Sequence, residues 1–275
     1  MNDSLRLPTV FDRFFDDAAI FPPGLAPLDQ AVHEHIARRS IPLGGSVGPL
    51  LLTAAHLDDA ARIAEALAGS EPLRVGVVVA PDEVESVLHA IEEVRPAIKV
   101  SGLELKTSNT DLKQSLADAV ALSDRFDVHV EFSIDHIRAG AVSLLTETPV
   151  RLKARMGGLI PQAFPTIPDV AAVILAAVAA NTSFKLTAGL HRAVRYTDAT
   201  TGFDHHGFVN IAVATAAALE GAKYADLTAT LAEDSGEILA ERFRSIGTGW
   251  RSTFESFGTC SIVEPVDTLT ELGLT

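Results

Sequence analysis

Short apolar runs alternate with longer segments of helical spacing along most of the chain. Runs rich in Val, Leu, Ile and Phe predict strands, and the stretches between them place apolar residues three or four positions apart, as helices do. The predicted strands are Ala18–Pro22, Pro49–Thr53, Arg74–Ala80, Val100–Lys106, Val128–Ser133, Val150–Met156, Ser183–Gly189 and Phe254–Ser261.

The segments between the strands support this interpretation. Leu57–Ala68 has apolar residues near one face and charges largely on the other, and Pro81 is expected to open the next helix. Phe208–Leu219 is apolar nearly all round. We expect this helix to be covered by an extra helix near Asp226–Arg244 or by another subunit, and the second alternative predicts a homo-oligomer.

Eight strand–helix units with short connections predict an α/β fold, a (βα)8 TIM barrel with an extra helix and a long loop after strand seven. An open doubly wound sheet is the alternative. No Ser/Gly-rich or Pro-rich stretch separates two regimes of composition, so residues 1–275 are expected to form one domain.

Strand parity predicts which side chains point into the barrel, because successive residues alternate between the two faces of a strand. In four consecutive strands the apolar residues share one face and the polar residues share the other. The predicted inward positions are Gly102, Glu104 and Lys106; His129, Glu131 and Ser133; Arg151, Lys153 and Arg155; and Ser183, Lys185, Thr187 and Gly189.

The charged side chains among these positions sum to +3 in a chain whose formal charge is −14. This local reversal predicts an anionic substrate, a carboxylate or a phosphate. The alternative is that some of these charges, Arg151 above all, lie at the lower end of the barrel in neutralising pairs, since unpaired buried charges are costly.

Lys153 and Lys185 fall on adjacent predicted strands, so their ammonium groups are expected to lie close together. Such crowding lowers the pKa of at least one lysine, and a neutral lysine amine is a nucleophile for carbonyl carbon. The alternative is that the two cations clamp an anion without reacting.

The long loop after the seventh strand carries His191, Arg195 and the pair His205-His206, and loops at this end of a barrel build active sites. His191 and His206 are candidates for proton transfer, with exposed loop histidines as the alternative. Adjacent histidines do not easily share one ligand, so no metal is expected. The last strand places small groups, from Gly258 to Ser261, where barrels often bind phosphate.

The composition of the chain limits the classes of binding partner and the expected cellular location. A −14 chain is repelled by nucleic acid, and Cys260 is the single cysteine, which excludes an internal disulfide. The longest apolar run, Val170–Ala180, is too short to cross a membrane and predicts a buried helix. The acidic N-terminal stretch lacks the pattern of an export signal, so a cytoplasmic protein is expected.

Two resemblances rest on particular segments. The first resemblance is to a bacterial β/α-barrel family to which we assign no activity, and it extends over nearly the full chain. The segments that carry it are Ile20–Pro23, Lys153–Gly158 with Ala163–Pro165, Thr187–His191, His206–Phe208, and Ser256–Ser261 with Glu264-Pro265. The last three strands resemble class I aldolases of the deoxyribose-phosphate aldolase type.

The aldolase resemblance implies a Schiff-base lysine on strand six, a second lysine on strand seven and a phosphate site on strand eight. Here these correspond to Lys153 in Leu-Lys-Ala-Arg-Met-Gly-Gly, Lys185 in Phe-Lys-Leu-Thr-Ala-Gly, and Gly258 in Phe-Gly-Thr-Cys-Ser. Arg155 stands where the family has a small hydroxyl residue, the phosphate motif is altered, and the histidine-bearing loop is foreign to the family.

Together these patterns predict a lyase of class I aldolase type that acts on a small anionic carbonyl or sugar substrate without a cofactor. Lys153 would form the Schiff base, Lys185 would lower its pKa, and Glu131 or Glu104 would move the proton. Arg155, Lys106, Thr187, Arg195, Gly258 and Ser261 would bind the substrate. The alternatives are a non-covalent isomerase, epimerase or decarboxylase of a small anionic sugar, and a ligand-binding barrel without catalysis.

Overall fold

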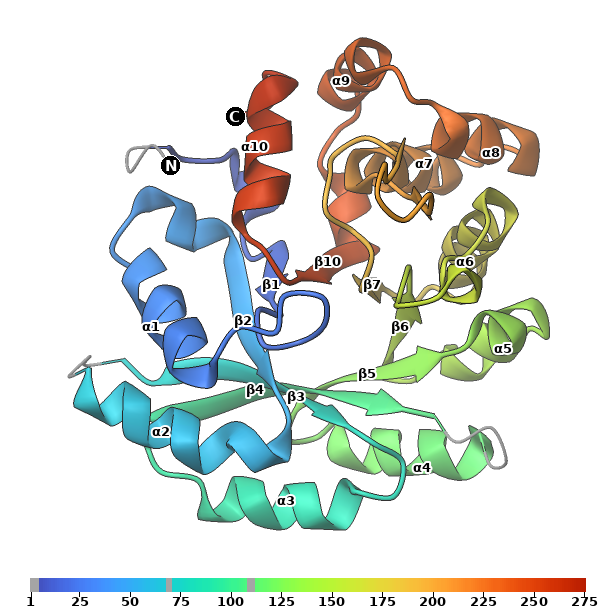
Figure 1. The fold of residues 1–275 in the computed structure, drawn as a ribbon. Coiled ribbons are helices and arrows are strands. Elements are labelled where there is room, and N and C mark those ends of the chain that lie inside the picture. Colours follow the sequence, from blue (N-terminus) through green and yellow to red (C-terminus); the bar gives the residue numbers. More distant parts are fainter. Residues whose placement is uncertain (1–4, 68–70, 108–111) are drawn as a thin grey trace.

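The chain folds into a closed barrel of eight parallel strands with helices around it, a (βα)8 TIM barrel (Figure 1). The structure is a computed structural model, and it describes residues 5–67, 71–107 and 112–275. Around the barrel the strands follow the order β1-β10-β7-β6-β5-β4-β3-β2, and β1 closes the ring by pairing with β10 and β2. The barrel strands are β1 (Phe15–Asp17), β2 (Val47–Leu52), β3 (Leu73–Val79), β4 (Ile98–Lys106), β5 (Asp127–Phe132), β6 (Arg151–Arg155), β7 (Phe184–Thr187) and β10 (Phe254–Thr259).

Seven of the eight predicted strands are confirmed to within a few residues, and the first is wrong. The segment Ala18–Pro22 follows β1 and forms a loop, whereas the strand itself is Phe15–Asp17. Two adjacent acids are typical of a solvated turn as well as of a site, yet all three residues of β1 are buried. Asp16 points into the barrel, and Asp17 binds His35 and Arg38 on the outer side.

The outer layer consists of helices that follow the strands. They are α1 (Leu28–Arg38), α2 (Leu57–Ala66), α3 (Val84–Glu93), α4 (Leu112–Leu122), α5 (Ile134–Arg138), α6 (Ile167–Ala179), α7 (Phe208–Leu219), α8 (Tyr224–Ala232), α9 (Gly236–Ser245) and α10 (Val263–Glu271). Short 3-10 turns are η1 (Thr9–Phe11), η2 (Pro42–Ser46), η3 (Ala54–His56), η4 (Ala141–Leu145), η5 (Pro161–Ala163) and η6 (Gly249–Ser252).

Two helix predictions need correction. Pro81 lies in a turn, and α3 begins three residues later at Val84. The single extra helix expected near Asp226–Arg244 is two helices, α8 and α9, because the Ser235 side chain accepts a hydrogen bond from the Ile238 N–H and starts a new helix. Both helices contact α7, so the apolar α7 is covered within the chain.

One segment, Pro161–Ala179, is long and apolar enough to cross a membrane by length and composition among the described residues. In the fold its helical part, α6, contacts α5, α7 and α8 and buries Val170, Val173 and Ile174 in the core. It is a core helix of the barrel, which is compatible with a soluble protein. The Thr166 side chain starts it in a capping box with Asp169.

An aromatic cluster anchors the closing strand. Phe14 and Phe15 pack edge-on against Phe257 of β10 at centroid distances of 5.3 and 5.5 Å, and Trp250 and Phe208 cover the same region. These rings fix β1 from the outer side of the barrel. The aromatic side chains of this cluster lie outside the barrel, and polar side chains of the strands point into its interior.

The connection after β7 is long and carries its own small sheet. Strands β8 (Tyr196–Thr197) and β9 (Asp204–His205) pair antiparallel before α7 begins. This loop lies over the end of the barrel where β6 and β7 terminate (Figure 1). It brings histidines to the mouth of the barrel, as its position in the sequence predicted.

Candidate active site at the C-terminal mouth of the barrel

The centre of the barrel holds a chain of alternating charges. Glu104 on β4 bridges two lysines: its Oε2 lies 2.8 Å from Lys153 Nζ, and its Oε1 accepts a hydrogen bond from Lys185. Lys153 also lies 2.6 Å from Oε2 of Glu131, and Lys185 donates to Asp16 at 2.6 Å. Strand parity brings these groups together, because Lys153 and Lys185 are register partners on β6 and β7.

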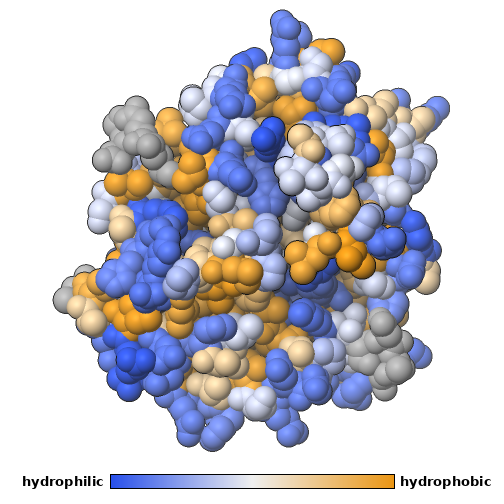
Figure 2. Space-filling view, viewed as in Figure 1, coloured by the Kyte–Doolittle hydropathy of each residue, from blue (hydrophilic) through white to orange (hydrophobic). Residues whose placement is uncertain are grey.

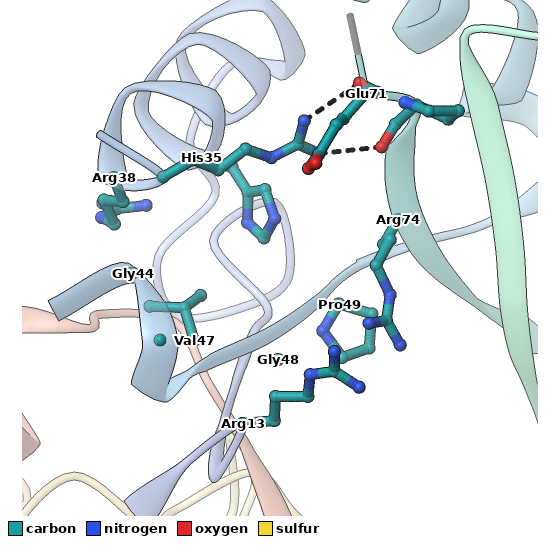
Figure 3. Close-up of a pocket in the computed structure, with 12 residues that line it drawn as sticks. Arg13, His35, Arg38, Gly44, Val47, Gly48, Pro49, Glu71 and Arg74 are labelled. Atoms are coloured by element: carbon teal, nitrogen blue, oxygen red, sulfur yellow. Dashed lines mark hydrogen bonds between the residues drawn. The ribbon is translucent and has the colours of Figure 1, made fainter. Parts of the chain in front are cut away.

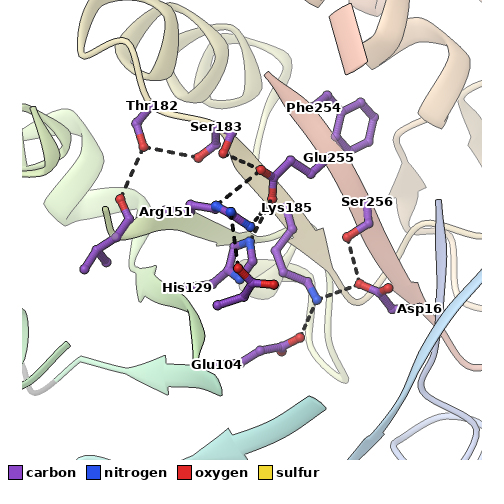
Figure 4. A network of polar contacts seen from close by, with 12 residues as sticks. Asp16, Glu104, His129, Arg151, Thr182, Ser183, Lys185, Phe254, Glu255 and Ser256 are labelled. Atoms are coloured by element: carbon purple, nitrogen blue, oxygen red, sulfur yellow. Dashed lines mark hydrogen bonds and ion pairs between the residues drawn. The ribbon is translucent and has the colours of Figure 1, made fainter. Parts of the chain in front are cut away.

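The two lysines are held differently. Lys185 makes hydrogen-bonded ion pairs with both of its carboxylates, and Ser256 donates to the same Asp16 oxygen at 2.8 Å (Figure 4). Lys153 contacts its carboxylates at ion-pair distance without hydrogen-bond geometry, and both facing oxygens have no hydrogen-bond partner in the described part of the chain. The Lys153 amine is therefore held chiefly by its ion pairs with these two carboxylates.

The pKa values in this chain of charges follow from burial and from the neighbouring ions. Burial alone would raise the pKa of Glu104, but Lys153 and Lys185 outweigh it and hold that pKa well below its usual range. Burial would lower the pKa of Lys185, but Asp16 and Glu104 raise it above its ordinary value. The pKa of Asp16 stays raised because burial exceeds the effect of Lys185.

The expected crowding of two bare cations is thus replaced by a bridged arrangement. A carboxylate stands between Lys153 and Lys185, and Lys185 has a raised pKa rather than a lowered one. The cationic interior of +3 is also corrected, because β1 and β10 add Asp16 and Glu255 while β3 adds Arg74, which reduces the sum to +2.

A second polar cluster lies beneath the first, toward the N-terminal end of the barrel (Figure 4). Glu255 accepts hydrogen bonds from Ser183 at 2.6 Å, contacts His129 at 3.0 Å, and pairs with Arg151 at 3.4 Å. Burial would raise the pKa of Glu255, but His129, Ser183 and Arg151 together lower it to about 2. Arg151 also pairs with Asp127, which confirms the alternative that this arginine is neutralised at the lower end.

Above the charges, a pocket of about 540 Å³ opens at the C-terminal mouth of the barrel. Lys153 and Glu104 line its floor, and Lys106 and Arg155 stand on its wall. Arg155 donates to Glu131 at 3.1 Å, whereas Lys106 has no carboxylate partner within the described residues. Much of the remaining lining is apolar: Ala18, Phe21, Pro22, Pro23, Leu51, Val78, Leu159, Ile160 and Phe164.

Hydrophobic side chains also reach the rim of this pocket. Leu159 and Ile160, on the connection between β6 and α6, are 75% and 58% exposed. The space-filling view shows hydrophobic side chains near the centre of a face that is otherwise largely hydrophilic (Figure 2). The mouth thus combines a charged floor with an apolar wall and rim.

The loop after β7 places two histidines at the mouth. His191 lines the pocket, and its Nδ1 contacts Glu264 of α10 at 2.9 Å, which orients the ring. Burial lowers the pKa of His191, and Glu264 partly offsets this effect. His205 also lines the pocket, with Nδ1 against the Gly189 carbonyl oxygen at 2.9 Å.

Two predicted loop residues lie elsewhere. His206 is buried behind the mouth, with Nε2 at 2.8 Å from the Pro165 carbonyl oxygen, and it does not line the pocket. Arg195 faces Asp204 at 3.7 Å and is also outside the pocket lining. His206 therefore ties the loop to the segment before α6, and the Arg195–Asp204 pair lies within the loop.

Of the residues predicted to bind the substrate near strand eight, some line the pocket and one does not. Thr187 and Gly258 line the pocket as register partners on β7 and β10. Ser261 does not: its N–H donates to Thr259, and its hydroxyl accepts from the Glu264 N–H at the start of α10. Cys260 also lines the pocket, and burial raises the pKa of its thiol.

Sequence reasoning missed Asp16, Glu255, Ser256 and Glu264. Parity applied to Phe15–Asp17 places Asp16 on the inner face, so that signal was present once β1 is bounded correctly. Glu255 and Ser256 are consecutive on β10 and bind inward groups on both sides of a register shift between Phe254 and Ser256, which alternation does not predict. Glu264 reaches His191 through tertiary packing of α10, which no local pattern reveals. No group of three or more His, Cys, Asp or Glu side chains suited to a metal occurs in the described ranges.

Comparison with known proteins gives no family for the chain: no protein-family model, curated protein or solved structure matches it significantly. What the structure shows is a (βα)8 barrel with buried charges below a pocket at its C-terminal mouth.

Proposed function

We propose that the protein is a lyase of class I aldolase type, in which Lys153 attacks the carbonyl carbon of a small anionic substrate. One observation carries the proposal. Lys153 is 1% exposed, its amine lies between Glu104 and Glu131, and it lines the floor of the pocket at the mouth, where a ligand can approach the buried charges from the loop side.

The surrounding carboxylates suit each charge state of this chemistry. The Lys153 ammonium gives a proton to Glu131, and the free amine then attacks the carbonyl to form a carbinolamine. Return of a proton from Glu131 to the departing hydroxyl releases water and leaves a protonated imine. The imine carries the same single positive charge as the original ammonium, so the two carboxylates that stabilise the ammonium also stabilise the intermediate.

Bond cleavage then uses the imine as an electron sink. A base removes the proton from the hydroxyl group β to the imine carbon, the carbon–carbon bond breaks, and its electron pair moves onto the imine nitrogen to give an enamine. His191, which lines the pocket and is oriented by Glu264, can take this proton, as can Glu131 of the adjoining cavity through a water. Protonation and hydrolysis of the enamine release the second product and restore the amine.

Lys185 has a different role in the proposal. It lines the pocket at the N-terminal end of the barrel rather than the mouth, and its two hydrogen-bonded carboxylates raise its pKa. A permanently charged Lys185 keeps Glu104 ionised and in place. We therefore assign Lys185 to positioning Glu104 and not to covalent chemistry.

The residues that line the mouth limit the class of substrate that can bind there. Lys106 and Arg155 provide cationic groups for a carboxylate or phosphate, and Thr187 offers a hydroxyl. The apolar wall leaves few partners for the hydroxyl groups of a long sugar. The proposal is a carbonyl compound with one anionic group and an apolar segment, a small anionic metabolite of the cytoplasm.

Reductive trapping tests the proposal. The protein is incubated with sodium borohydride and a panel of aldehydes, 2-oxo acids and sugar phosphates, and intact mass and peptide mapping locate any adduct. We expect a stable adduct on Lys153 that is absent in Lys153→Arg and retained in Lys99→Arg, which changes an exposed lysine on β4. An unmodified Lys153 across the whole panel would overturn the proposal.

A non-covalent isomerase, epimerase or decarboxylase is the second candidate. It is favoured by the ion pairs themselves, because a lysine already paired with two carboxylates can act as a fixed cation beside a developing negative charge. This candidate predicts substrate turnover without a trapped adduct and measurable activity in Lys153→Arg. A bound ligand returned unchanged after long incubation would instead indicate a binding barrel.

A further inference from the structure

A separate pocket of about 270 Å³ lies between α1, η2 and the start of β3 (Figure 3). Four arginines line it: Arg13 just before β1, Arg38 at the end of α1, Arg39 just after it, and Arg74 on β3. Arg13 and Arg74 also line the pocket at the N-terminal end of the barrel. This basic pocket, defined by Arg13, Arg39 and Arg74, is therefore at the end of the barrel opposite the mouth.

The charge of the basic pocket is not compensated. Among the described residues, no carboxylate pairs with the guanidinium groups of these three arginines, while the nearby Arg38 is neutralised by Asp17 and Glu34. Arg39 donates to two backbone carbonyl oxygens, those of Glu71 and Pro72. Glu71 is the one acidic side chain in the lining and is exposed.

Arg74 is placed where a cation is unfavourable. It alternates with the outward residues Leu73 and Val75, so its side chain starts on the inner face of β3. Burial lowers the pKa of Arg74, and the charges of Arg13 and Arg39 lower it further, with Asp127 opposing them. Figure 3 shows the side chains of Arg13 and Arg74 converging beside Pro49.

The backbone at Arg13 is also unusual. Its φ is +50°, in the left-handed region that disfavours residues with a side chain, and its N–H donates to the Gly45 carbonyl oxygen at 3.0 Å. Strained backbone of this kind persists where the surrounding structure imposes it, and it gathers at binding sites. Arg13 has this backbone conformation, and its guanidinium converges with that of Arg74.

We propose that the basic pocket binds a small multivalent oxyanion, a phosphate group. Guanidinium forks pair with the oxygens of phosphate in a bidentate way, and one dianion relieves the repulsion among three cations at once. A single carboxylate offers two oxygens and one charge, which matches the convergent pair Arg13 and Arg74 with Arg39 on the same lining less well. The site is independent of the chemistry proposed at the mouth.

Binding of inorganic phosphate is the test. Full-length protein is titrated with sodium phosphate at pH 7.5 and constant ionic strength by calorimetry, and the thermal midpoint is followed in parallel against sodium chloride. We expect saturable binding with a rise in the midpoint, since a ligand that binds only the folded state stabilises it. Arg13→Asn and Arg74→Gln should each weaken binding by roughly tenfold or more.

Matched variants separate this site from general salt effects. Arg13→Asn tolerates the left-handed backbone, so the fold is expected to persist, and circular dichroism checks it. Arg62→Gln removes an exposed arginine of α2 and should bind phosphate as the parent protein does. Absence of saturable binding in the parent protein would overturn the proposal, and so would equal binding in an Arg13→Asn/Arg74→Gln double variant.

Discussion

Glu104 is the carboxylate on which the buried charges of the barrel depend. It is 2% exposed and separates the amines of Lys153 and Lys185, which are register partners on adjacent strands. Changing Glu104 to Gln keeps the shape of the side chain and removes its charge. The two lysines are then left facing each other with one negative charge fewer between Asp16 and Glu131.

The expected cost follows from the spacing of the strands. Two unit charges about 5 Å apart repel by about 3 kcal/mol at an effective dielectric constant of about 20. Breaking a buried ion pair by removing one partner costs about 3–5 kcal/mol in other proteins. We therefore expect Glu104→Gln to lower the free energy of unfolding by about 3–5 kcal/mol.

Urea denaturation at pH 7, followed by circular dichroism, measures this loss. Glu241→Gln, an exposed residue of α9, is the matched control and should change the free energy by less than about 0.5 kcal/mol. Adding Lys185→Met to Glu104→Gln removes the excess cation and should recover part of the loss. If Glu104→Gln behaves like Glu241→Gln, the bridged arrangement does not hold the barrel interior together.

Three further predictions concern the pH dependence of stability, the pKa of His191 at the mouth, and the backbone conformation of Gly189 after β7. Because the pKa of Glu104 is held below its unfolded-state value, its stabilisation is complete above about pH 5 and is lost as the pH falls through the folded pKa, so the free energy of unfolding should fall more steeply on acidification in the parent than in Glu104→Gln, and equal slopes contradict the lowered pKa. Glu264→Gln removes the group that raises the pKa of His191, so NMR titration of the His191 ring should give a lower pKa than in the parent; an unchanged value contradicts the contact. Gly189→Ala adds a Cβ 2.6 Å from the Met156 carbonyl oxygen at a φ of +73°, and thermal unfolding should show a larger loss than for Gly221→Ala, where φ is +84° with nothing within 4 Å.

Most of the barrel could be predicted from the sequence because buried parallel strands and amphipathic helices leave strong local patterns. The inward faces of β4 to β7 followed directly from alternation, and Glu104, Glu131, Lys153 and Lys185 all lie in the interior. The first strand was placed too late. Its apolar follower, Ile20-Phe21, belongs to the loop at the mouth, where hydrophobic side chains face a cavity instead of a helix layer.

The charge balance of the site was harder to predict than its position. Parity identifies which side of a strand a residue faces, but the partner of an inward cation lies several strands away around the ring. Asp16 and Lys185 are 169 positions apart in the chain. The sequence thus predicted a cationic interior, and tertiary closure of the barrel supplied the acids that balance it.

The ion pairs of Asp16 and Asp17 help to fix the register of β1, the strand that closes the barrel. Strand β1 is three residues long, and one acid binds Lys185 inside while the next binds His35 and Arg38 outside. Ion pairs on both faces of β1 therefore stabilise its pairing with β10, the last strand of the barrel. A slip of one residue would exchange the two acids and break every pair at once, so the charges set the register at the point where the ring of strands meets its own beginning.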